Sequence, residues 1–330
     1  MKSTKLIALL LCIVMLFSLA ACTAGGGEKA LAVTDHAGRT VELESEAEKL
    51  VSGYYITTSM LIAMDLDDRL VGIEAKAASR PIYALAAPEL LELPNVGTAK
   101  DFNLEGCIAL EPDLVILPLK LRDAAETLTQ MGIPAICVNP ENDELMAETV
   151  NMIAALTGAE KAAKKLLSHG EKALADLADD LSGAEAPTVY LGGNSAFLST
   201  AGSAMYQHSL IENAGAINLA AEITDSYWAE VSYEQLLAWD PDYIVIVPGA
   251  DYTAADVLAD SAVSGLSAVK NGRVLEMPDD YESWDSPVPS AFLGSLWLAS
   301  QLHGDVFSQA DFNAALSEFY TGFYGFEPEN

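Results

Sequence analysis

The chain carries one fourteen-residue pattern twice: residues 103–116 read NLEGCIALEPDLVI, and residues 232–245 read SYEQLLAWDPDYIV. In each copy a Glu (Glu105 or Glu234) opens a short amphipathic helix, and an acid–Pro–Asp turn ends that helix. The apolar and β-branched residues that follow predict a buried strand. Because the two units are alike, we expect two similar lobes with a ligand between them, where pockets concentrate.

Strand and helix patterns alternate along both halves of the chain, a rhythm that favours parallel sheets. Residues 157–183 are rich in Ala, Lys, Leu and Glu and contain no Pro, so they predict one long helix. The expected fold class is therefore α/β and bilobed. An N-terminal lobe at 31–156 and a C-terminal lobe at 184–330 are joined by a single rigid helix.

The N-terminus predicts export. Lys2 and Lys5 precede an apolar run of signal-peptide length, which ends in Leu-Ala-Ala-Cys at Cys22. That ending resembles the bacterial lipobox, so we expect a signal peptide at 1–21, lipid modification of Cys22 and a flexible tether at 22–30. An ordinary secretory peptide with an incidental Cys is the alternative. The protein would then sit outside the cytoplasm, held to the membrane only by its lipid.

Composition excludes some partners. The net charge is −31, and removal of Lys2 and Lys5 with the leader leaves −33. Such a surface repels nucleic acid and anionic lipid. In the folded part only Cys107 and Cys137 remain, both in apolar stretches, and we interpret them as buried free thiols rather than a disulfide or a metal site.

Ligands of open α/β sheets sit at loops that follow the carboxyl ends of strands. Aromatic side chains there offer flat apolar area, and cations pair with anionic groups. Trp228, Tyr281, Trp284 and Tyr55 are the first choices among the aromatic residues, and Arg80 is the first choice among the cations. Each of these residues has a second interpretation, as a packing residue or a solvated charge. The full set of candidate ligand-binding residues is Tyr54, Tyr55, Arg80, Tyr83, Phe102, Lys120, Arg122, Asn194, Phe197, Trp228, Tyr281 and Trp284.

Several segments together resemble the substrate-binding lipoproteins of ABC importers for metal chelates, the group that handles ferric siderophores, haem and cobalamin. They are the lipobox, VTDHAGRTVEL at 33–43, the first copy of the repeat, the long helix and NGRVLEMP at 271–278. The resemblance implies a periplasmic-binding-protein-like fold with a shallow cleft. It also implies that Glu105 and Glu234 dock onto Arg residues of two permease subunits. The alternative interpretation is that each Glu only stabilises the positive end of its own helix.

The resulting hypothesis is a monomeric receptor that binds a metal chelate, first of all a ferric siderophore, and delivers it to an ABC permease dimer with its cytoplasmic ATPase. No catalytic residue, cofactor or nucleic-acid partner is expected. The four His residues are scattered, which disfavours a site for a bare metal ion. Haem or a corrinoid, with an axial ligand from a Tyr or His208, is the alternative ligand.

An enzyme and a tethered sensor or adhesin are the alternative classes of protein. Common catalytic motifs such as G-x-S-x-G, the P-loop and H-E-x-x-H are absent from the sequence. Asp279, Asp280 and Glu282 near Trp284 are the candidates for a pair of glycosidase carboxylates, but we interpret them as a solvated acidic loop.

Overall fold

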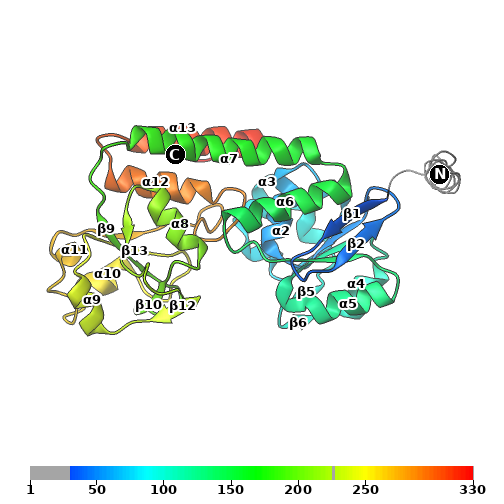
Figure 1. The fold of residues 1–330 in the computed structure, drawn as a ribbon, viewed down its shortest axis with the longest axis horizontal. Coiled ribbons are helices and arrows are strands. Elements are labelled where there is room, and N and C mark those ends of the chain that lie inside the picture. The colour runs from blue at the N-terminus through cyan, green and yellow to red at the C-terminus, as the bar shows by residue number, and fades with distance from the viewer. Residues whose placement is uncertain (1–29, 225–226, 330) are drawn as a thin grey trace, which may run out of the picture.

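The computed structural model describes residues 30–224 and 227–329 (Figure 1). The predicted signal peptide, Cys22 and all but the last residue of the predicted tether lie outside the described residues. Within the described part of the chain, no helix is long and apolar enough to cross a membrane.

Each lobe is built on a four-stranded parallel sheet, so the predicted bilobed α/β fold is confirmed. In the N-terminal lobe the strand order is β4-β3-β7-β8, and in the C-terminal lobe it is β11-β9-β13-β14. The N-terminal strands are β3 (Leu50–Ser52), β4 (Leu70–Ile73), β7 (Leu114–Pro118) and β8 (Ala135–Val138). The C-terminal strands are β9 (Thr188–Gly192), β11 (Ile217–Asn218), β13 (Tyr243–Ile246) and β14 (Val274–Glu276).

Short antiparallel pairs lie at the edges of the lobes, and helices cover the sheets (Figure 1). The pairs are β1 (Leu31–Thr34) with β2 (Thr40–Leu43), β5 (Gly97–Thr98) with β6 (Asp101–Phe102), and β10 (Ser199–Ala201) with β12 (Trp228–Glu230). The helices of the N-terminal lobe are α2 (Tyr55–Ala63), α3 (Pro81–Ala86), α4 (Leu104–Ala109), α5 (Arg122–Gln130) and α6 (Asp143–Thr157). Those that follow are α7 (Glu160–Asp180), α8 (Tyr206–Asn213), α9 (Tyr233–Trp239), α10 (Ala254–Ala259), α11 (Ser267–Lys270), α12 (Phe292–Leu302) and α13 (Gln309–Phe323).

The two copies of the repeated pattern fold alike. Asn103 caps α4 by accepting a hydrogen bond from the third residue on, and Ser232 caps α9 in the same way. At the far end of each helix the acid that precedes Pro is left-handed, with φ of 49° at Glu111 and 44° at Asp240. Each helix therefore stops at the acid–Pro–Asp turn and releases the chain into β7 or β13.

The Asp of that turn joins the new strand to its neighbour. The Asp113 carboxylate accepts hydrogen bonds from the backbone N–H groups of Glu48 and Lys49, at 3.1 and 2.8 Å, just before β3. The Asp242 carboxylate accepts from the backbone N–H and the hydroxyl of Thr188, both at 2.8 Å, at the start of β9. The repeat thus encodes the central strand pair of each sheet, β3 with β7 and β9 with β13.

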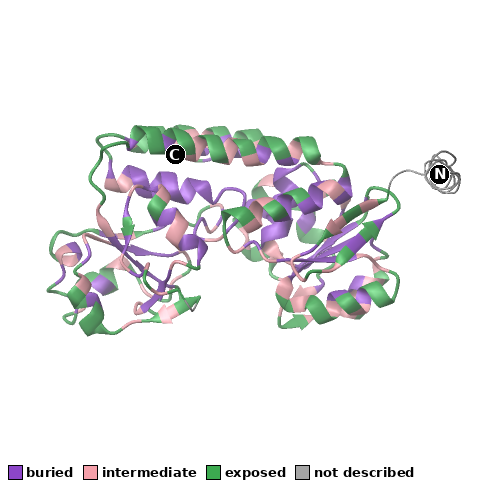
Figure 2. Ribbon diagram, in the orientation of Figure 1, coloured by how far each residue is buried: buried purple, intermediate pink, exposed green. Residues whose placement is uncertain are grey.

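Helix α7 lies within the predicted helical stretch and spans the space above both lobes (Figure 1). One side of the helix packs on the protein and the other faces solvent (Figure 2). The structure also shows a second connection between the lobes that the sequence analysis does not predict. Helix α13 runs back alongside α7 towards the N-terminal lobe (Figure 1). The Lys165 ammonium of α7 donates to the Gly322 carbonyl at 3.0 Å, and Tyr324 lies 2.8 Å from the Ser59 hydroxyl of α2.

The largest apolar core runs through both lobes and includes Leu50 of β3, Leu166 of α7 and Leu298 of α12. Two smaller cores lie on the opposite faces of the sheets. One of them contains Cys107 and Cys137, which are free and buried as predicted, and burial raises the pKa of each thiol to about 11. The continuous core holds the lobes together at the α7 side and leaves their far ends apart.

Candidate ligand-binding site

Arg80 is an incompletely paired cation at the inner edge of the N-terminal lobe. Its guanidinium carbon lies 3.8 Å from the centre of the Tyr55 ring, and its Nε lies 3.7 Å from a Glu74 oxygen. The side chain donates no hydrogen bond to any described residue, and its buried Nε has only the longer ion-pair contact with Glu74. A guanidinium has five N–H donors in a fixed fork, so Arg80 is ready to bind an anionic group.

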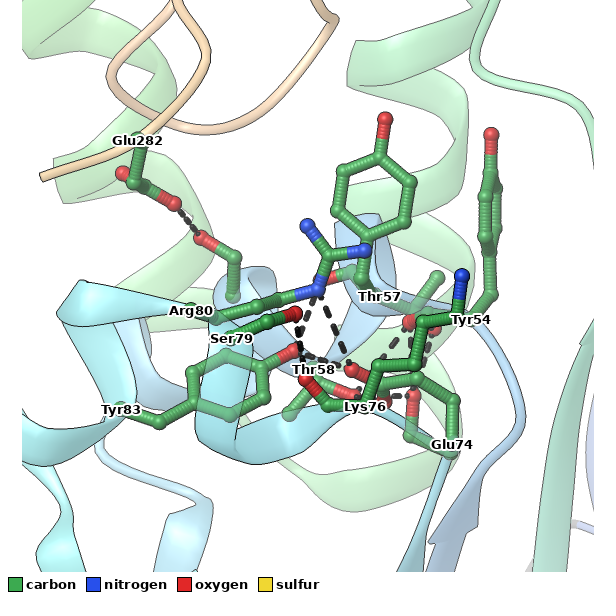
Figure 3. Close-up of polar contacts among 12 residues, drawn as sticks. Tyr54, Thr57, Thr58, Glu74, Lys76, Ser79, Arg80, Tyr83 and Glu282 are labelled. Atoms are coloured by element: carbon green, nitrogen blue, oxygen red, sulfur yellow. Dashed lines mark hydrogen bonds and ion pairs between the residues drawn. The ribbon is translucent and has the colours of Figure 1, made fainter. Parts of the chain in front are cut away.

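Glu74 holds this cation in place. It directly follows β4, is only 5% exposed, and accepts hydrogen bonds of 2.6 Å from both the Thr58 hydroxyl and the Tyr83 hydroxyl. Figure 3 shows these side chains converging beside Arg80. Burial raises the pKa of the Glu74 carboxyl, and the hydrogen bonds and Arg80 oppose that rise. The network fixes the position of Arg80 through an ion pair and leaves the guanidinium free to donate hydrogen bonds to a ligand.

The C-terminal lobe reaches this site through residues 277–291, which connect β14 to α12 and which we call the crossing segment. Tyr55 donates a hydrogen bond of 3.2 Å to Ser286 of this segment. Glu282 is buried there and accepts hydrogen bonds from Ser59 of α2 and from Ser290. Burial raises the pKa of Glu282. The site is therefore assembled from both lobes.

A cavity of about 420 Å³ lies at this junction. Its walls include Tyr55, Arg80 and Tyr83 from the N-terminal lobe and residues 279–283 from the crossing segment. This volume is within the range typical of small-molecule sites. Arg80 stands on one wall, and acidic residues of the crossing segment stand on the other.

The structure brings together some of the predicted ligand residues and not others. Tyr54 and Tyr55 pack edge to face, with ring centres 5.4 Å apart, beside Arg80. In contrast, Lys120 and Arg122 are exposed after β7 and do not line the cavity, and Arg122 lies near Asp123 and Glu126. Phe102 is half-buried against the smaller core of that lobe.

In the C-terminal lobe, two predicted residues are accessible and one is a packing residue. Asn194 is exposed on the loop after β9, and Trp228 is 37% exposed with its ring lying over Gly193. Phe197 instead packs edge to face between Tyr190 and Tyr252, with ring centres 5.7 and 5.8 Å away.

Trp284, a predicted ligand residue of the crossing segment, is a packing residue in this structure. Its side chain is only 2% exposed, its ring packs against Phe312, and its indole N–H donates to the Tyr320 hydroxyl at 3.1 Å. Tyr281 lines the cavity, but its ring also packs against Tyr320, and its hydroxyl donates to a backbone carbonyl near the C-terminus. Helix α13 packs over both residues. The sequence around residue 284 gives no indication of this packing, because α13 is distant in the chain.

Buried carboxylates were missed. Glu282 was interpreted as part of a solvated loop, which is correct for the exposed Asp279 and Asp280 and wrong for Glu282. Asp285 is also buried, and burial raises its pKa to about 6. Glu74 carried a usable signal, because a carboxylate directly after a buried strand lies at the ligand edge of a parallel sheet.

The two Glu residues of the repeat occupy like places. Glu105 and Glu234 are each the second residue of their helix, and both are exposed. Helices α4 and α9 lie on different lobes, both on the side away from α7 (Figure 1). Among the described residues, no group of three or more His, Cys, Asp or Glu side chains is placed to hold a metal ion.

Comparison with known proteins identifies the family. Residues 38–281 match the model of a periplasmic binding protein family. The chain is 25% identical to the molybdate-binding protein MolA of Haemophilus influenzae, over 90% of this chain and 92% of that protein. It is 26% identical to the ABC transporter substrate-binding lipoprotein YvrC of Bacillus subtilis, over 84% of this chain and 87% of that protein.

Solved structures agree with this result. The periplasmic solute binding protein of Veillonella parvula matches with a TM-score of 0.78 and 25% identity, over 92% of this chain and 95% of that chain. The family match covers well over half of the sequence, and the relatives are transport receptors. This chain therefore belongs to the periplasmic binding protein family and is a solute-binding protein of the ABC importer class.

Proposed function

We propose that this chain is a lipid-anchored receptor on the outer face of the bacterial cytoplasmic membrane. It binds an anionic metal chelate, with ferric siderophores as the first class, between its lobes and delivers it to an ABC permease. The observation that carries the proposal is the Arg80 guanidinium, which is held by Glu74 and Tyr55 and donates no hydrogen bond to any described residue. The Tyr54 and Tyr55 rings beside it offer the flat apolar area that an organic chelator needs.

A compact oxyanion is a second candidate ligand. The similarity to MolA extends over nearly the whole chain, and that protein is named for molybdate binding. An Arg fork suits an oxyanion as well as a chelate carboxylate. The Tyr54 and Tyr55 rings favour the chelate, because a small oxyanion gains nothing from flat apolar surface whereas an organic chelator does.

Haem or a corrinoid is the remaining alternative. His208, the His proposed as an axial ligand, lies on α8 with Nε2 at 3.4 Å from Glu212 and Nδ1 at 3.4 Å from Asn218. Both ring nitrogens thus have polar neighbours already. This arrangement weakens the case for axial ligation by His208 and leaves a Tyr as the protein ligand for that class.

A titration tests the ligand class. Residues 23–330 are followed by thermal shift and Trp fluorescence with ferric catecholate and hydroxamate siderophores, haem, cobalamin, molybdate, zinc and manganese. A ligand at a hundred times its dissociation constant stabilises the fold by about 2.7 kcal/mol. A saturable response to a ferric siderophore supports the proposal, and a response to molybdate alone selects the oxyanion. A response to free zinc or manganese only, or to nothing in the panel, contradicts it.

Delivery rests on the two exposed Glu residues. The double variant Glu105→Ala, Glu234→Ala is expected to abolish uptake into cells while the dissociation constant of the purified receptor stays unchanged. Each carboxylate suits an Arg pocket, since a guanidinium binds a carboxylate through two parallel hydrogen bonds. Full uptake by the double variant would contradict the docking role and favour a sensor or adhesin that works without a permease.

A further inference from the structure

A second cavity, of about 330 Å³, lies beneath α7 and outside the site described above. Its walls come from α6 of the N-terminal lobe, from α7, from Tyr206 of α8, from residues 288, 289 and 291 before α12, and from Phe292, the first residue of α12. The two cavities share only Val288. We propose that this cavity is a binding site for a small apolar molecule that carries one ammonium group.

The size and lining of the cavity suit an apolar body. Met146, Val150, Leu166, Leu174 and Phe292 are among the residues that line it. An apolar cavity of about 150 Å³ binds benzene, so this larger one accommodates an aromatic ring with a short alkyl chain. Burying that surface removes apolar area from water on both the ligand and the protein, which is the main driving force for binding.

Gly170 keeps the cavity open. It lies inside α7, where a glycine destabilises a helix by about 1 kcal/mol relative to Ala. Neither backbone angle nor crowding demands a glycine there, because its φ is not positive and an added Cβ would meet only Phe292, at 3.5 Å. The missing side chain therefore leaves space beside Phe292 where a Leu would fit.

The polar groups of the cavity favour a cationic head. The ionisable groups that line it are Tyr206 and, where the cavity opens to solvent, the exposed Asp143 of α6 and Glu171 of α7, and no Lys or Arg lines it. The Tyr206 side chain is only 5% exposed, and its hydroxyl makes no hydrogen bond to another described residue. Two carboxylates and one free hydroxyl can accept hydrogen bonds from an ammonium group, whereas an anion would be repelled.

Three probes with one apolar body test the proposal on residues 23–330, the part of the chain that contains all described residues. They are 2-phenylethylamine, 2-phenylethanol and phenylacetate, titrated by calorimetry and ligand-observed NMR near neutral pH. The amine is expected to bind saturably, about tenfold more tightly than the alcohol, which corresponds to about 1.4 kcal/mol. Phenylacetate is expected not to bind. Equal binding of all three, or none by the amine, would overturn the proposal.

Variants locate the site. Gly170→Leu fills the cavity and is expected to abolish binding of the amine. Gly322→Leu is the matched control, since Gly322 also lies in a helix but has no neighbouring atom within 4 Å of an added Cβ. Ala147→Leu fills the cavity from α6 and is also expected to abolish binding of the amine. It replaces Gly170→Leu as the test variant if Gly170→Leu does not fold. Unchanged amine binding in the filled variant would show that the molecule binds elsewhere.

Discussion

Replacing Arg80 with Gln separates ligand binding from stability. The change removes a guanidinium that stacks on Tyr55 at 3.8 Å and lies 3.7 Å from Glu74. A partly desolvated cation–π contact contributes about 1–2 kcal/mol, and the Glu74 carboxylate keeps its hydrogen bonds from Thr58 and Tyr83. We therefore expect the free energy of unfolding to fall by about 1–2 kcal/mol, with the fold retained.

The effect on affinity is expected to be larger. Truncating one partner of a buried, hydrogen-bonded charge pair weakens binding by about 2–5 kcal/mol. The Arg80 side chain is 29% exposed, so the lower part of that range applies, about 2–3 kcal/mol. This corresponds to a dissociation constant raised about 30- to 150-fold. Arg80→Lys keeps the charge but loses the fork, and an intermediate affinity is expected.

The assay is calorimetric titration of the wild-type receptor and its variants with the ligand that the panel identifies. Arg122→Gln is the matched control, because Arg122 lies on the same lobe and is exposed beside Asp123 and Glu126. It is expected to leave both affinity and stability unchanged. The reasoning fails if Arg80→Gln binds as tightly as the wild type while its circular dichroism is native, or if Arg122→Gln weakens binding to the same degree.

Three further perturbations test the core, a buried acid and the anchor. Burial raises the pKa of Asp285 from 3.8 to about 6, so folding takes up a proton between these values and the free energy of unfolding falls as pH rises through them. Asp285→Asn should remove this decline. If the melting temperatures of the variant and the wild type change with pH in the same way between about pH 4 and pH 8, the prediction is contradicted. Trp284→Ala should lower the free energy of unfolding by about 3–5 kcal/mol in urea titrations, because it empties a core position, whereas a loss of ligand affinity without destabilisation would reinstate Trp284 as a ligand residue. Cys22→Ser should release the receptor from the membrane fraction into the soluble fraction on cell fractionation, and retention at the membrane would refute the lipid anchor.

Features encoded in short stretches were predictable from the sequence. The caps at Asn103 and Ser232 are contacts between residues three apart, and each acid–Pro–Asp turn ends its helix locally. The two lobes and the long helix were predictable from apolar runs and local composition, which are visible in short windows of the sequence. The Arg80 and Tyr55 candidates came from the rule that ligand loops follow strands, and the structure places these two side chains in contact.

Only the tertiary structure decided which side chains face the site. Trp284 and Glu282 lie in one loop with the exposed Asp279, yet they are buried because α2 and α13 pack on them from far away in the sequence. Burial depends on contacts with residues far away in the sequence. The local sequence around an acidic residue in such a loop is therefore the same whether its carboxylate is solvated or buried. The cavity beneath α7 has the same origin, since its walls come from both lobes and exist only once they have packed together.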